Sequence, residues 1–157
     1  MSRKKTLKVV TWTAVVIATI LAWISGYIVM QIIYDSVAAG IVFGTVWATI
    51  VCCESRFSYV SLKSDGKIAI TKEEVKSNLW QIFASTLVAI LVTIPLELAL
   101  YKTAIADKVG GQASDLGSQL RGLADLLPMN WLPMLLLCLL VIAIYQTPIF
   151  IRMASDD

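Results

Sequence analysis

Histidine does not occur among the 157 residues of this chain. That absence removes the side chain that most often binds metal ions and moves protons near neutral pH. Charged residues make up 15% of the sequence, whereas about 25% is usual in soluble globular domains. The formal net charge of +2 is too small to indicate a nucleic-acid partner. These shortages argue against a metalloenzyme, a soluble domain and a nucleic-acid-binding protein, and we expect no cofactor.

Cysteine is also scarce, with three residues, of which Cys52 and Cys53 are adjacent. This spacing is not that of a disulfide framework. We interpret the pair as reduced, small apolar residues at the cytoplasmic end of a helix, and a lipid attached to either thiol is the alternative. The sequence also shows no Ser or Cys nucleophile with a nearby base. An enzyme is therefore the weakest of the function classes considered, and we expect a non-enzymatic protein.

Hydrophobic residues, in contrast, make up 58% of the chain, and the mean hydropathy is +0.78. They gather in four segments, residues 9–33, 37–53, 79–101 and 132–151. A helix rises about 1.5 Å per residue and the hydrocarbon core of a bilayer is about 30 Å thick, so most of these segments are long enough to cross. The sequence predicts an all-α membrane protein, with residues 1–157 forming one integral membrane domain built as a four-helix bundle.

The N-terminal segment admits two interpretations, because a basic start precedes a long apolar run. A cleaved signal peptide has an apolar core of about 7–15 residues, and the run from Val9 to Ile33 has 25. We therefore expect a retained transmembrane helix. Ten basic residues lie before the first span, in the loop 54–78 or after the fourth span, and three lie in the loop 102–130. By the positive-inside rule, we expect both termini of this multi-pass protein to be cytoplasmic.

Small residues recur every four positions on the first two spans. The first row is Ala14, Ala18, Ala22 and Gly26, and the second is Ser36, Gly40, Gly44, Ala48 and Cys52. Gly40 and Gly44 form a GxxxG motif, which lets two helix backbones approach closely in lipid. The favoured interpretation is packing of the two rows against each other within one chain. The alternative is a homo-oligomer that forms through this face.

The third span carries the most unusual residues. Pro95 has no N–H and leaves the carbonyl of Leu91 without its helical partner. Glu97 lies near the outer boundary of the span, where it either caps the helix and reaches water or faces the bundle interior. A row at four-residue spacing favours the interior, because its members are small or polar: Gln81, Ser85, Ala89, Thr93 and Glu97. Pro148 similarly frees the carbonyl of Ile144 in the fourth span.

The two polar loops contain predicted elements of their own. In the cytoplasmic loop 54–78, residues 59–63 and 67–71 alternate around Gly66 and predict a short β-hairpin. Thr71 to Glu74 match a capping box, which predicts the start of a helix. In the outer loop 102–130, four leucines predict one face of a short amphipathic helix that Pro128 ends: Leu116, Leu120, Leu123 and Leu127.

Three short stretches carry a resemblance to a known family: residues 55–61, 95–101 and 147–152. Their order resembles a bacterial family of four-span membrane proteins that forms a domain of unknown function. That family has an Asp-Arg-Phe-like motif, a Pro-Leu-Glu motif and a late proline followed by aliphatic residues and a Lys. Here Ser55 replaces the Asp, and the family's long coiled-coil insertion is reduced to residues 102–130. The resemblance implies the four-span topology and a multi-pass protein of the bacterial inner membrane, and it brings no biochemical role.

The function expected from the sequence is association, with other helices or with a protein partner in the bilayer. We expect contact surfaces on the cytoplasmic loop and on the outer amphipathic segment, toward a second copy or another membrane protein. The alternative is a small oligomeric channel, pore or permeabilising protein that uses the polar face of the third span. The residues singled out for a function are the polar Glu97, Thr93 and Arg56, together with the prolines Pro95 and Pro148.

Overall fold

The computed structural model describes residues 3–61, 72–109 and 116–153, and within these ranges every element is a helix. Four of the helices are long and apolar enough to cross a membrane. They are α1 (Arg3–Tyr34), α2 (Val37–Ser61), α4 (Leu79–Leu100) and α6 (Leu116–Met153). The shorter helices are α3 (Lys72–Ser77) and α5 (Lys102–Val109). The chain is therefore a multi-pass membrane protein that is helical throughout the ranges described.

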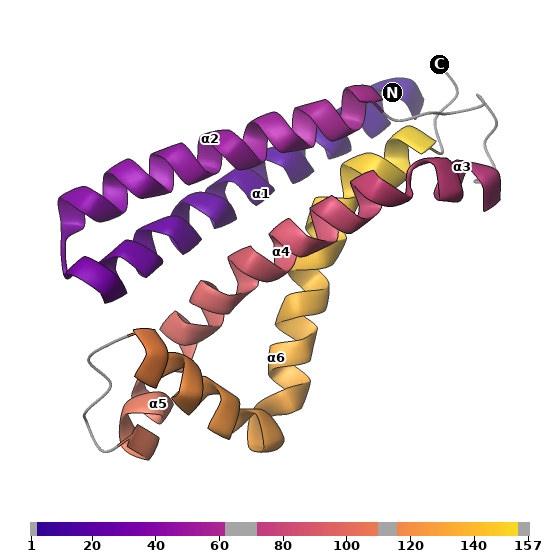
Figure 1. Cartoon of the computed structure of the whole chain (residues 1–157). Helices are drawn as coiled ribbons and strands as arrows, with labels where there is room; N and C mark the ends of the chain where they lie inside the picture. The colour runs from indigo at the N-terminus through magenta and orange to yellow at the C-terminus, as the bar shows by residue number, and fades with distance from the viewer. Residues whose placement is uncertain (1–2, 62–71, 110–115, 154–157) are drawn as a thin grey trace.

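A tight turn joins α1 to α2, as the two residues between the apolar runs predict. Asp35 adopts a left-handed conformation with φ 47°, which Asp tolerates better than most residues other than glycine. The Ser36 hydroxyl then accepts a hydrogen bond from the Ala39 N–H at 3.3 Å, as an N-cap residue does. The turn sends α2 back antiparallel to α1, and the two helices lie side by side (Figure 1).

The predicted β-hairpin is wrong at its start. Helix α2 continues through Ser61, so residues 59–61 are helical where the alternating pattern predicted a strand. Alternation over five residues is a weak signal, and these residues follow directly on a helix that already supplies their backbone hydrogen-bond partners. Residues 62–71, which include the other strand and the predicted cap Thr71, lie outside the described residues. Helix α3 does begin at Lys72.

Helix α6 consists of two parts that meet at a kink at Asn130, whose φ is −123° and ψ is 23°. The first part contains the predicted amphipathic segment, which ends at the kink, two residues beyond the predicted end at Pro128. Its buried face also differs from the predicted one, because Leu123 and Leu126 are buried while Leu120 and Leu127 are exposed. Leu123 and Leu126 pack in a cluster that includes Leu98 of α4 and Ile105 of α5. Contacts with α4 and α5 therefore determine which face of this segment is buried.

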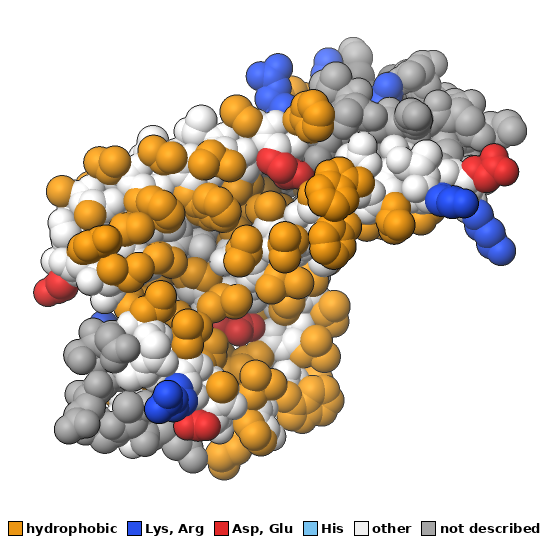
Figure 2. Space-filling model, viewed as in Figure 1, with side chains coloured by type: hydrophobic (Ala, Val, Ile, Leu, Met, Phe, Trp, Pro, Cys, Tyr) orange, Lys and Arg blue, Asp and Glu red, His pale blue; other side chains and the backbone are white. Residues whose placement is uncertain are grey.

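The ends of the helices fall into two groups (Figure 1). At one end, here called the basic end, α1 and α4 begin and α2 and α6 finish. At the other, the opposite end, lie the α1–α2 turn, α5 and the first part of α6. Hydrophobic side chains cover most of the face between the two ends (Figure 2). The start of α1 and the end of α6 therefore lie at the same end of the bundle.

Candidate functional site

The polar row of α4 faces the interior of the bundle. Ser85 and Thr93 are each only 2% exposed, and Ala89 between them is fully buried. Gln81 and Glu97, at the two ends of the row, are half-buried. Because each unsatisfied polar group in hydrocarbon costs several kcal/mol, a polar row in a membrane helix needs partners from protein. For Ser85 that partner is on α6.

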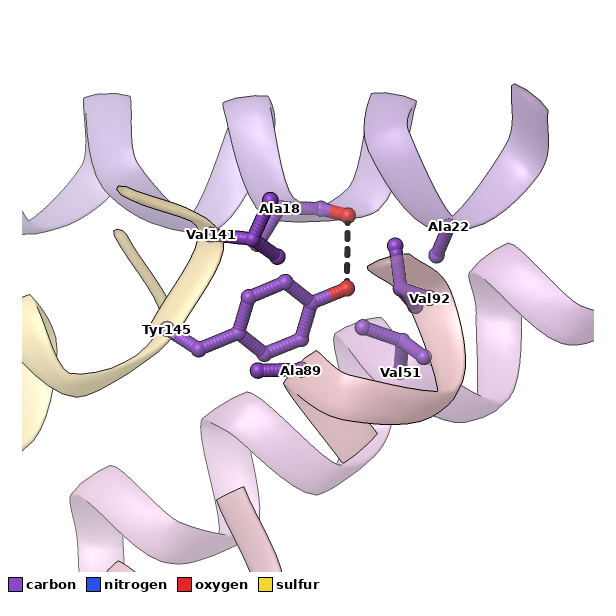
Figure 3. Packing of buried hydrophobic residues seen from close by; sticks show 7 residues of the cluster. All are labelled: Ala18, Ala22, Val51, Ala89, Val92, Val141 and Tyr145. Atoms are coloured by element: carbon purple, nitrogen blue, oxygen red, sulfur yellow. Dashed lines mark hydrogen bonds between the residues drawn. The ribbon is translucent and has the colours of Figure 1, made fainter. Parts of the chain in front are cut away.

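Tyr145 of α6 is the centre of this arrangement (Figure 3). Its hydroxyl donates a hydrogen bond to the Ala18 carbonyl oxygen of α1 at 3.0 Å. Its own carbonyl oxygen accepts one from the Ser85 hydroxyl of α4 at 3.2 Å. The ring lies among small and branched apolar side chains, which include Ala89 and Val141. One residue thus connects three spanning helices.

Gln146 makes the next connection between α6 and α4. Its Nε2 donates to the Ile82 carbonyl oxygen at 2.9 Å and to the Thr86 hydroxyl oxygen at 2.7 Å. The Thr86 hydroxyl in turn donates to the same Ile82 carbonyl at 2.7 Å. The Oε1 atom of Gln146 is buried and has no hydrogen-bond partner in the chain. Tyr145 and Gln146 together hold α6 against α4 near the basic end.

Glu97 lies at the far end of the row, in the last turn of α4. Pro95, two residues earlier, is buried inside the helix. Cys138 of α6 lies beside Thr93 and within electrostatic reach of the Glu97 carboxylate. The Thr93 hydroxyl, however, donates to the Ala89 carbonyl of its own helix at 2.8 Å. The structure therefore brings Glu97, Thr93 and Cys138 together where α4 approaches the second part of α6.

Two other predicted functional residues lie away from Glu97. Arg56 is exposed near the end of α2, at the basic end, whereas Glu97 is near the opposite end. Pro148 is buried in α6, two residues after Gln146. Pro148 therefore lies near the hydrogen bonds of Gln146 to α4. Arg56 lies near neither those bonds nor Glu97. The five residues thus do not form one site.

The small-residue rows meet each other between α1 and α2. A Cβ atom added to Gly44 would lie 2.8 Å from the Trp23 carbonyl oxygen, and one added to Gly26 would lie 3.1 Å from the Gly44 Cα. A Cβ on Gly40 would lie 2.7 Å from a ring carbon of Tyr27. Three alanines of the two small-residue rows are buried as well: Ala18, Ala22 and Ala48. The GxxxG face is thus occupied by α1 of the same chain.

Tyr145 carries more connections than any residue that the sequence pattern singled out. The available signal was a Tyr–Gln pair inside an otherwise apolar span, since each of these side chains needs a polar partner in hydrocarbon. That signal indicates burial against protein but does not say which helix supplies the partner. In the described ranges, no three His, Cys, Asp or Glu side chains are grouped to hold a metal ion.

Chemically, this arrangement joins helices through hydrogen bonds between side chains and carbonyl oxygens. These contacts form a structural seam across α1, α4 and α6. The Glu97 carboxylate lies at the end of the seam that is farther from the basic end. Compared with protein-family models, curated proteins and solved structures, the chain matches none of them.

Proposed function

We propose that the chain is a non-enzymatic membrane protein that acts by association, and that the first part of α6 is its contact surface. The observation that carries this proposal is the two-faced character of that segment. Leu123 and Leu126 pack on the protein's own helices, while Leu127 is 51% exposed and Met129 is 74% exposed. An apolar face at the end of a bundle is suited to another membrane protein or to a second copy of this chain.

The polar groups inside the spans support the same proposal. Hydrogen bonds within the chain already use the side-chain donors of Ser85, Tyr145 and Gln146. A conduction path along the polar face of α4 would have to separate α4 from α6 and break these bonds. The channel alternative therefore requires a rearrangement that association does not.

A photo-crosslinking amino acid at position 127 tests the proposal, with the same residue at position 46 as the matched control. Leu127 and Val46 are both 51% exposed, and Val46 lies on α2, away from the proposed surface. We expect protein adducts from position 127 and lipid adducts alone from position 46. Mass measurement of the purified protein in lipid nanodiscs separates a second copy from another partner. Lipid adducts alone at both positions would contradict the proposal.

We also propose that the basic end is cytoplasmic, as the excess of basic residues favours. Single cysteines introduced as Lys76→Cys and Asp35→Cys into a cysteine-free chain test this orientation, because both positions are exposed at different ends. A membrane-impermeant maleimide added to intact spheroplasts should label Asp35→Cys and spare Lys76→Cys. The reverse pattern would invert the topology.

A further inference from the structure

Two single-residue breaks in the helices separate one part of this protein from the rest. Tyr101, between α4 and α5, has φ −99° and ψ 13°, and Asn130, between the two parts of α6, has φ −123° and ψ 23°. Both pairs of angles lie closer to the sparsely populated bridge region than to the α region. Between these breaks the structure describes α5 and the first part of α6, here called the cap. The cap therefore joins the spanning helices at two points where the backbone leaves the helical conformation.

The cap packs on the spanning helices through an apolar cluster of its own. Ile105, Leu123 and Leu126 come from the cap, and they pack with two residues of the spanning helices, Leu98 of α4 and Met134 of the second part of α6. The apolar cluster shown in Figure 3 contains none of these residues. Because apolar contacts are not directional, a cap held in this way can move as a unit without disturbing the centre of the bundle.

Glu97 lies in the layer next to the cap. It precedes Leu98 by one residue, and Cys138, which is within electrostatic reach of the Glu97 carboxylate, follows Met134 by one helical turn. In Figure 1, α4 and the second part of α6 diverge toward the opposite end, and the first part of α6 lies between their ends. The cap therefore lies between Glu97 and the water phase at the opposite end.

The two breaks have the properties of hinges. Hinges are a few residues at the ends of structural elements that absorb changes in φ and ψ. Next to Asn130, Pro133 has no N–H and leaves the Met129 carbonyl without its usual helical partner. We propose that the cap is a hinged lid, which turns about Tyr101 and Asn130 and opens Glu97 to water. A carboxylate beside hydrocarbon is more stable when water reaches it. The proposal concerns the inner face of the cap, so it does not depend on what binds the outer face.

Thiol labelling of the full chain tests the lid. In a chain whose three native cysteines are replaced by alanine, Glu97→Cys is reacted with a water-soluble methanethiosulfonate in mixed micelles. We expect it to react about tenfold or more slowly than Asp125→Cys, at an exposed position of the cap, because reaction requires the lid to open. Met134→Ala removes a buried side chain that packs on the cap. It should speed the labelling of Glu97→Cys about tenfold or more, since truncation of a buried methionine shifts a packing equilibrium by at least that factor.

Two controls show whether the cap alone moves. Leu135→Ala, at the neighbouring exposed position, should leave the rate at Glu97→Cys within about twofold. Val92→Cys reports on the centre of the bundle, because Val92 is fully buried in the cluster of Figure 3. Its labelling should stay equally slow with and without Met134→Ala. A rate at Glu97→Cys that Met134→Ala does not change, or that equals the rate at Asp125→Cys from the start, would overturn the proposal. Equal acceleration at Val92→Cys would overturn it too, because the whole bundle would then open.

Distances between spin labels separate a hinged lid from an unfolded cap. Asp107→Cys and Arg121→Cys are at exposed positions on the two helices of the cap, and Tyr34→Cys is at an exposed position at the end of α1. In Met134→Ala we expect a second, longer distance between positions 107 and 34 and an unchanged distance between positions 107 and 121. A single distance between positions 107 and 34 would contradict a moving lid. If the distance between positions 107 and 121 also broadens, the cap unfolds and does not turn, and the proposal is wrong.

Discussion

Two pairs of helices, α1 with α2 and α4 with α6, are held together by different kinds of contact. Between α1 and α2 the backbones approach closely, because Gly26 and Gly44 leave no side chain in the way. Between α4 and α6 the contact depends on hydrogen bonds from Ser85 and Gln146. Lipid tails are as apolar as leucine, so neither pair gains from the hydrophobic effect, and each needs tight packing or polar contacts.

Each helix pair is therefore expected to be sensitive to a different kind of substitution. A backbone contact cannot yield to an added side chain, so the α1–α2 pair should be damaged by enlargement. A side-chain hydrogen bond between membrane helices is worth about 0.6 kcal/mol on average and about 1.7 kcal/mol at most. The α4–α6 pair should therefore lose stability in smaller steps.

The largest effect is expected from Gly44→Leu. Its Cβ would lie 2.8 Å from a backbone carbonyl oxygen, so α1 and α2 must separate, and overpacking of this kind costs about 3 kcal/mol at the upper end of its usual range. The free energy of unfolding in mixed micelles checks this. Val46→Leu, at an exposed position of the same helix, should leave stability within about 0.5 kcal/mol. If the two variants are equally stable, the glycine contact does not hold the pair together.

Tyr145→Phe should have an intermediate effect. The change removes only the hydroxyl that bonds Ala18 at 3.0 Å and keeps the ring among its apolar neighbours. We expect a loss of about 1 kcal/mol in the same unfolding measurement. Tyr34→Phe is the matched control, because Tyr34 is 66% exposed and should tolerate the change. Equal losses in both variants would mean that the α1–α6 bond contributes nothing specific.

Gln146→Met should cost less than Tyr145→Phe, although it removes two hydrogen bonds. The substitution also removes the buried Oε1 atom that has no partner in the chain, and that gain offsets part of the loss. We expect a net loss of about 0.5 kcal/mol. Thr147→Val, which deletes a hydroxyl bonded within its own helix, should be nearly neutral. A loss above about 2 kcal/mol for Gln146→Met would show that Oε1 has a partner, such as a bound water.

Glu97→Gln should have the smallest effect. The side chain keeps its size and loses a charge that is half-buried at the end of α4, so stability should stay within about 0.5 kcal/mol. Under the association proposal, cation flux from liposomes should be negligible before and after the change. Asp125→Asn, an exposed acid at the same end, is the control. Flux in the original protein that Glu97→Gln abolishes, with assembly intact, would favour the channel.

Local patterns predicted the spanning helices because the bilayer demands long apolar stretches whatever their neighbours. Helix α4 ends one residue before its predicted span does, α1 begins six residues before its predicted span, and α2 extends beyond its predicted span through Ser61. The resemblance to a four-span family stays a prediction. The kink at Asn130 lies between Pro128 and Pro133, close to the end that Pro128 predicted. The burial of Leu126 was not predictable, because it depends on how the first part of α6 packs on α4 and α5.

The candidate seam shows the same division. Four-residue spacing indicated that Ser85 and Thr93 face protein, and they are buried. The pattern did not identify Tyr145, whose hydroxyl bonds a residue 127 positions away. Sequence alone determined that this chain enters the membrane as helices with small and polar rows turned inward, since that follows from the cost of polar groups in hydrocarbon. Only the tertiary structure decided which helix each row meets, because a row at four-residue spacing fits any helix that presents a complementary surface.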